Sequence, residues 1–135
     1  MRKITMEIGK IKIEASLFDT PTADAIYNSL PIMSKAETWG EEVYFETPIE
    51  AALENSAKDI VELGELAYFP DEKVIAIGFG RTPVSEGDEI RLADKCNIWG
   101  KALNDVRQLK AVKEGDNVSI NKIKAQGVIA CYRMP

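Results

Sequence analysis

The sequence contains no histidine among its 135 residues. Histidine is the commonest general base and a usual zinc ligand, so its absence excludes Ser-His and Cys-His nucleophile pairs and the usual zinc sites. Cysteine is scarce too, since Cys96 and Cys131 are the two in the chain and belong to no C-x-x-C motif. We expect both to be reduced, small, buried side chains, as in an intracellular protein. We predict no metal site and no cofactor.

Long apolar runs are also missing. No run approaches the roughly 20 residues that cross a bilayer, and residues 1–7 contain no apolar segment of the kind found in signal peptides. These absences predict a soluble, cytoplasmic protein. The chain has no excess of positive charge either, because its net charge is −5. We therefore expect neither nucleic acid nor an anionic membrane as a partner.

The composition is that of an ordinary globular protein, with 45% hydrophobic and 29% charged residues. Disorder would require fewer apolar residues and a larger charge imbalance. The sequence shows no repeat, linker or low-complexity segment. We predict one domain over residues 1–135, a length that can bury a substantial core.

The N-terminal elements have the clearest boundaries. Apolar and polar residues alternate over 4–8 and over 11–15, with a glycine in the intervening turn. This pattern predicts a β-hairpin. A helix is expected over 21–30, because Asp19 or Thr20 can cap its free amides and a proline occupies its first position.

Short strand-like runs make up the rest of the chain. We expect strands over 42–46, 59–63, 66–69, 74–79, 97–99, 118–123 and 128–132, and a second helix over 103–109. The run 74–77 is apolar almost throughout, which predicts a strand buried on both faces. Many short strands with two isolated helices indicate a barrel, or an α+β fold with a closed sheet.

Three segments, in their order along the chain, give a more specific indication of the fold. Their residues are Thr38-Trp39-Gly40-Glu41-Glu42-Val43-Tyr44-Phe45 with Thr47-Pro48, then Gly64, Tyr68 and Pro70, then Phe79-Gly80-Arg81-Thr82-Pro83. Over roughly residues 2–123 the chain resembles a family of small bacterial and archaeal cyclophilin-like proteins of uncharacterised function. The resemblance implies a mainly β fold: a closed eight-stranded β-barrel with two short flanking helices.

The resemblance carries no catalytic mechanism to this chain. Cyclophilin prolyl isomerases use an arginine within a phenylalanine-histidine-arginine stretch and a further histidine. The comparable region here holds Glu41 and Glu42 and no arginine, and the chain has no histidine. We therefore expect no peptidyl-prolyl isomerase activity, since a shared fold does not imply a shared function.

The strand over 42–46 carries the first candidate site. Alternation places Glu42, Tyr44 and Glu46 on one face. It places Val43 and Phe45 on the opposite face, toward the core. If the first face lines a groove, the two carboxylates could act together in acid–base chemistry. The alternative is that both are solvated surface charges.

Two further candidates flank this strand. Trp39-Gly40 could be an aromatic platform for a ligand or a barrel corner, and its repetition at Trp99-Gly100 favours the corner. In the 79–83 loop, Arg81 could bind a carboxylate or polarise a carbonyl oxygen, or could pair with a neighbouring glutamate.

We predict from these residues a non-catalytic module that binds a peptide or a small molecule. Its groove would be formed by Trp39, Glu42, Tyr44, Glu46, Tyr68, Phe79, Arg81 and Thr82. One alternative is an enzyme of unassigned type, isomerase-like or hydrolytic, that uses a Glu42/Arg81 pair. Another is a structural or homo-oligomer-forming domain, in which these aromatics belong to the core or to an interface.

Overall fold

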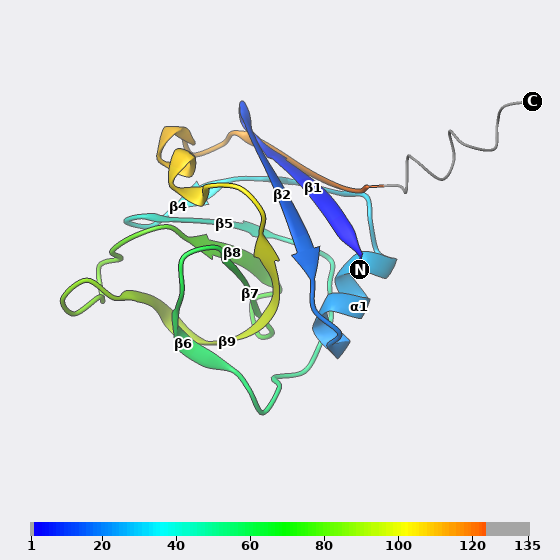
Figure 1. Ribbon diagram of the computed structural model, residues 1–135, viewed down its shortest axis with the longest axis horizontal. Coiled ribbons are helices and arrows are strands. Elements are labelled where there is room, and N and C mark those ends of the chain that lie inside the picture. The colour runs from blue at the N-terminus through cyan, green and yellow to red at the C-terminus, as the bar shows by residue number, and fades with distance from the viewer. Residues whose placement is uncertain (1, 124–135) are drawn as a thin grey trace, which may run out of the picture.

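The computed structural model describes residues 2–123, shown as the coloured ribbon in Figure 1. Its helices are α1 (Pro21–Asn28) and the 3-10 helix η1 (Val106–Ala111). Its strands are β1 (Lys3–Ile8), β2 (Ile11–Leu17), β3 (Ile32–Lys35), β4 (Glu37–Thr38), β5 (Glu42–Glu46), β6 (Lys58–Val61), β7 (Glu65–Phe69), β8 (Val74–Gly78), β9 (Ile90–Ala102) and β10 (Asn117–Lys122). The strand expected over 128–132 and Cys131 lie outside the described residues.

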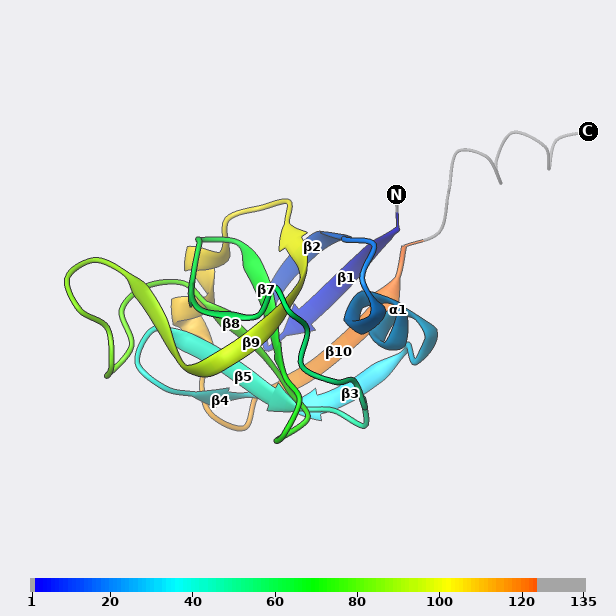
Figure 2. The same cartoon turned by 90° about the horizontal axis from the view of Figure 1, so that it is seen from below.

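The strands curl into a barrel-shaped antiparallel sheet (Figures 1 and 2). Their order is β3-β10-β1-β2-β9-β7-β8-β5-β4, and β6 pairs with β9 off this path. The two ends of the order are consecutive in the chain, because β3 and β4 flank the single residue Ala36. With β3 and β4 taken as one bent strand and β6 set aside, eight strands form the ring, and the predicted mainly β barrel is confirmed.

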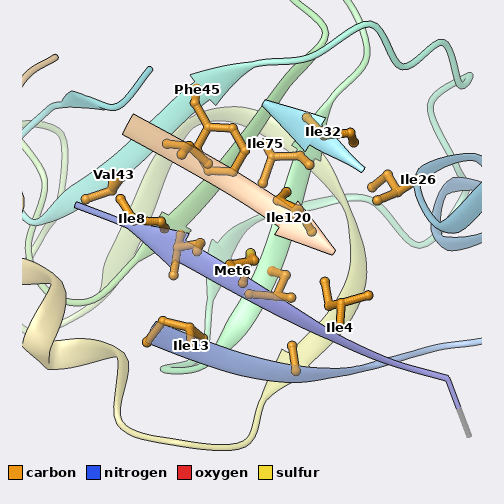
Figure 3. Close-up of a cluster of buried hydrophobic side chains, with 14 of the residues drawn as sticks. Ile4, Met6, Ile8, Ile13, Ile26, Ile32, Val43, Phe45, Ile75 and Ile120 are labelled. Carbon is orange, nitrogen blue, oxygen red and sulfur yellow. The ribbon is translucent and has the colours of Figure 1, made fainter. Parts of the chain in front are cut away.

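Alternating side chains fill the barrel. Ile4, Met6 and Ile8 of β1 are fully buried, and they face Phe45 of β5 and Ile75 of β8 across the interior. Figure 3 shows these apolar side chains converging from strands on opposite sides. Burial of this set removes a large apolar area from water, which is the main stabilising contribution to such a fold. The barrel interior is therefore a packed core and not a ligand cavity.

The predicted N-terminal elements are confirmed. The hairpin turns at Gly9, whose φ of 60° suits glycine at the first turn position. Thr20 caps α1 by accepting a hydrogen bond from the Ala23 N–H at 3.1 Å, and Ile26 packs into the core. The second helix is a 3-10 helix, displaced toward the C-terminus from its predicted range. None of the helices within residues 2–123 is long and apolar enough to cross a membrane.

One strand differs strongly from its prediction. The expected short strand over 97–99 lies in the second half of β9, which has 13 residues and curves across the molecule (Figure 1). Its second half pairs with β7, and its first half pairs with β6. Residues 92–95 form an irregularity that we call the β9 bulge, where Asp59 of β6 stands opposite four residues of β9. The bulge breaks the alternation of apolar residues, so the sequence pattern hides the strand.

The first half of β9 and β6 cover the outer face of β7 and β8. A second apolar cluster, which we call the outer cluster, fills the space between these layers: Val61, Ala67, Phe69, Val74, Ala76, Ile90, Leu92 and Cys96. All five residues of β8 are buried, which confirms the prediction of a strand covered on both faces. The molecule therefore has a core inside the barrel and a smaller core outside it.

Candidate functional site

A hairpin at the edge of the outer cluster presents three of the predicted site residues. β4 and β5 are joined by a turn in which the Trp39 N–H donates to the Glu42 carbonyl at 3.0 Å. Gly40 has a φ of 59°, and an added Cβ would lie 2.8 Å from Pro83 Cδ, so the turn requires glycine. The turn keeps Trp39 beside β5, where Glu42 and Tyr44 share the outer face.

These three side chains line a pocket of about 380 Å³ on the outside of the barrel. The remaining lining residues come from β7, the β7–β8 turn, β8 and the β9 bulge: Phe69, Glu72, Val74, Ala93 and Asp94. Strand pairing explains the convergence, because Glu42 stands opposite Gly78 and Tyr44 opposite Ala76. An added Cβ at Gly78 would lie 2.5 Å from Ile90 Cγ2, so the glycine lets β9 pack closely over the sheet beside Glu42.

The β9 bulge forms the opposite wall. Leu92, the first residue of the bulge, and Cys96, which follows the bulge, are buried in the outer cluster, whereas Ala93 and Asp94 are exposed between them and line the pocket. A bulge redirects side chains that a regular strand would send to alternate faces. The pocket thus exists because β9 departs from regular pairing at this point.

Glu42 is the unusual group of the pocket. Its side chain is 4% exposed, and its Oε1 atom is buried with no hydrogen-bond partner among the described residues. Burial raises the pKa of Glu42 to about 7, because desolvation disfavours the charged carboxylate. A buried polar atom without a partner is rare in a folded protein and is costly. The group is protonated at acidic pH and ionises near neutrality.

The pKa values of two neighbours of Glu42 are also raised. Burial and the Glu37 carboxylate, which accepts a 3.4 Å hydrogen bond from the Tyr44 hydroxyl, raise the pKa of Tyr44. Burial, followed by the charge of Glu42, raises the pKa of the Cys96 thiol to about 12. The Cys96 thiol donates to the Lys58 carbonyl at 3.2 Å. Cys96 is therefore a buried thiol that stays protonated, and not a nucleophile.

We predict that Cys96 will not react with a thiol reagent in the folded protein. Because the thiolate is the reactive form, burial and a pKa near 12 both oppose reaction. A Cys131→Ser variant, in which Cys96 is the sole thiol, should react with Ellman's reagent only after urea is added. Complete reaction within minutes without urea would contradict the burial of Cys96.

The comparisons with known proteins support the fold. The model of the Cyclophilin-like family matches residues 2–121. The chain belongs to this family. The cyclophilin-like protein is also 35% identical to a hypothetical protein of Archaeoglobus fulgidus with a solution structure. That likeness covers 90% of this chain and 95% of the other, with a TM-score of 0.78. No protein of curated function matches the chain.

The other predicted aromatics lie in the barrel core of the cyclophilin-like protein. Tyr68 is fully buried, and its hydroxyl donates to the Ile49 carbonyl at 2.6 Å. Phe79 is buried in the same core. Neither lines the pocket, because alternation turns Tyr68 inward and brings its neighbour Phe69 to the outer face.

The 79–83 loop is stabilised by its own contacts. The Arg81 guanidinium donates to the carbonyls of Ser85 and Gly87, and the buried Thr82 hydroxyl donates to the Arg91 carbonyl. The Arg81 side chain forms no ion pair among the described residues and does not line the pocket with Glu42. The structure therefore contains no Glu42/Arg81 pair.

The remaining predicted site residues are Glu46 and Trp39. Glu46 shares the outer face of β5 but is exposed and lies outside the pocket lining. The two Trp-Gly pairs differ: Trp99 is fully buried and donates from Nε1 to the Ala67 carbonyl at 3.1 Å, whereas Trp39 is half-buried at the pocket. Repetition of the dipeptide therefore does not indicate a shared role.

Five lining residues were missed from the sequence: Phe69, Glu72, Val74, Ala93 and Asp94. A signal for two of them was present. The apolar run of β8 indicates that another layer covers its outer face, and the outward side chains of β7 and β8 must meet that layer. Ala93 and Asp94 gave no such signal, because the bulge interrupts the pattern around them. Within residues 2–123, no three or more Cys, Asp or Glu side chains are grouped so as to hold a metal ion.

Proposed function

We propose that the cyclophilin-like protein is a binding module for a small ligand, or for one side chain of a peptide, in the outer pocket. The observation that carries the proposal is Glu42, a buried carboxyl group with an unpartnered oxygen in a hollow walled by Trp39, Tyr44 and Phe69. Apolar pockets with a few buried polar groups are typical ligand sites, and about 380 Å³ is within their usual size. A ligand donor would supply a hydrogen bond to this carboxyl group, which has no partner among the described residues.

The same carboxyl group favours a second candidate function, acid–base catalysis. A carboxyl with a pKa near 7 can both accept and donate a proton at neutral pH. Arg81 does not support this candidate, since its guanidinium is bound to its own loop. We rank binding first because no second catalytic group is paired with Glu42 among the described residues.

We also propose that the protein acts in the cytoplasm without nucleic acid. The net charge of −5 supports the absence of a nucleic-acid partner, because a negative surface repels polyanions.

Ligand binding can be tested by NMR with a set of small amines, alcohols and carboxylates at millimolar concentration. We expect some of them to shift the Trp39 indole signal and the amide signals of Glu42, Tyr44 and Ala93. An Ala93→Trp variant should abolish these shifts because the indole fills the pocket. The exposed residue Ala111 provides the control: an Ala111→Trp variant should retain the shifts. If no compound shifts the pocket signals, the proposed function is wrong.

A further inference from the structure

The charges of the pocket have one sign. Glu42, Glu72 and Asp94 line it, and no lysine or arginine does. None of these three carboxylates forms an ion pair among the described residues. A ligand of positive charge would meet an unbalanced negative field there, whereas an anion would be repelled.

Two nearby basic side chains are paired elsewhere, and Lys95, which follows Asp94 in the chain, is exposed and does not line the pocket. Arg91, on the same strand as Asp94, binds Glu89 at 2.6 Å and Asp59 at 3.2 Å. Lys73, beside Glu72 in the chain, binds Glu50 at 3.2 Å. These contacts leave the negative charge of the pocket for a ligand to neutralise.

The aromatic walls favour the same class of ligand. Trp39, Tyr44 and Phe69 line the pocket, and the rings of such residues attract cations through the quadrupole of the π system. The protein already uses this interaction elsewhere, because Lys122 Nζ lies 4.5 Å from the centroid of the Tyr27 ring. An anionic or purely apolar ligand would make no use of the combination of rings and carboxylates.

Resting on the proposed function, we propose that the pocket binds a primary ammonium group on a short apolar or aromatic stem, with Glu42 as its counter-ion. The stem packs against the aromatic walls while the ammonium pairs with the Glu42 carboxylate. An ammonium is a compact charge that one carboxylate can balance, without the paired fork that suits a guanidinium.

Binding also moves a proton in a defined direction. Where Glu42 is protonated, the incoming ammonium keeps its own protons and the carboxyl releases its proton to solvent, so a buried neutral acid becomes half of an ion pair. The ionisable groups that surround it from the packed elements are Glu37, Tyr44, Glu72, Asp94 and Cys96. Since Tyr44 and Cys96 have raised pKa values, they stay neutral between pH 6 and 8.

The test compares benzylamine with benzyl alcohol, which has the same ring and a neutral head. We expect benzylamine to bind at least about tenfold more tightly, followed by the Trp39 indole signal. Glu42→Gln should remove this preference, so that benzylamine binds no more tightly than benzyl alcohol. Glu46→Gln, a change on the same face of the same strand, should preserve the preference.

Proton release provides a readout that a purely structural role of Glu42 would not give. Calorimetry of benzylamine binding in buffers of different ionisation enthalpy should show release of most of a proton per ligand at pH 6 and much less at pH 8. Glu42→Gln should reduce the release at pH 6 to about zero.

The outcomes separate this inference from the proposed function. If benzylamine and benzyl alcohol bind equally, or if Glu42→Gln leaves the preference intact, the cationic class is wrong while the pocket remains a binding site. If other members of the compound set bind and benzylamine does not, the inference is overturned in the same way. If no compound reaches the pocket, the proposed function fails and the inference fails with it.

Discussion

Replacing Glu42 with glutamine should remove a loss of stability with rising pH. The wild-type protein undergoes this loss between pH 4.5 and pH 7. The pKa of Glu42 is about 7 in the folded protein and 4.5 as the ordinary value. Below pH 4.5 both states are protonated, and above it the unfolded chain ionises first. The unfolded state is therefore favoured progressively as the pH rises through 7. A shift of this size corresponds to about 3 kcal/mol in the free energy of unfolding.

Urea denaturation from pH 4 to pH 8 measures this effect. Glu42→Gln should gain about 3 kcal/mol relative to wild type between the two ends of the range. Other groups act in the opposite direction, since Arg91 and Arg107 lower the pKa values of Glu89 and Asp105. Their contributions are common to both proteins and cancel in the difference. Glu46→Gln should follow the wild-type curve, and a Glu42→Gln curve parallel to wild type would contradict the burial of this carboxyl.

Replacing Asn97 with alanine should cost about 3–4 kcal/mol of stability. Asn97 is fully buried on β9 and joins three segments far apart in the sequence. Its Nδ2 donates to Thr22 Oγ1 and to the Ala52 carbonyl, both at 2.9 Å, and its Oδ1 accepts from the Glu54 N–H at 2.8 Å. Truncation leaves the Ala52 carbonyl and the Glu54 N–H without this partner, whereas the Thr22 hydroxyl keeps its bond to the Glu54 carboxylate. Each unpaired group costs about 1–3 kcal/mol.

Asn104→Ala is the matched control for this prediction. Asn104 also makes two hydrogen bonds to backbone, from Nδ2 to the Lys12 carbonyl and from the Glu14 N–H to Oδ1, but these are exposed. Water can replace the lost side chain there, so the expected cost is about 1 kcal/mol or less. Both values come from urea denaturation at pH 7. Equal losses for the two variants would show that burial does not increase the cost at Asn97.

The local elements were the most predictable part of the fold. The hairpin of β1 and β2, the helix α1 with its Thr20 cap and the strand β5 are encoded by residues adjacent in sequence. Alternation and capping are short-range effects, so the sequence displays them directly. The barrel itself followed from the number of short strands and from the family resemblance.

The candidate site was predictable only on the side formed by adjacent residues. Trp39, Glu42 and Tyr44 lie within one hairpin, and strand alternation puts the last two on a common face. The burial of Glu42 could not be predicted, because the layer that covers it comes from β6 and β9, which follow later in the chain. For the same reason Asn97 looked unremarkable, since its partner Thr22 lies 75 residues away.

The outer cluster lies between the barrel, which holds the fold together, and the pocket, whose residues can vary. The barrel interior is solid, so nothing that recognises a ligand has to be accommodated there. The pocket instead depends on a short hairpin turn and on the projecting residues Ala93 and Asp94 of the β9 bulge. Substitutions of these projecting residues alter the size and charge of the pocket without disturbing the barrel core. Proteins built on this frame can therefore diverge in what they recognise while their barrels stay alike.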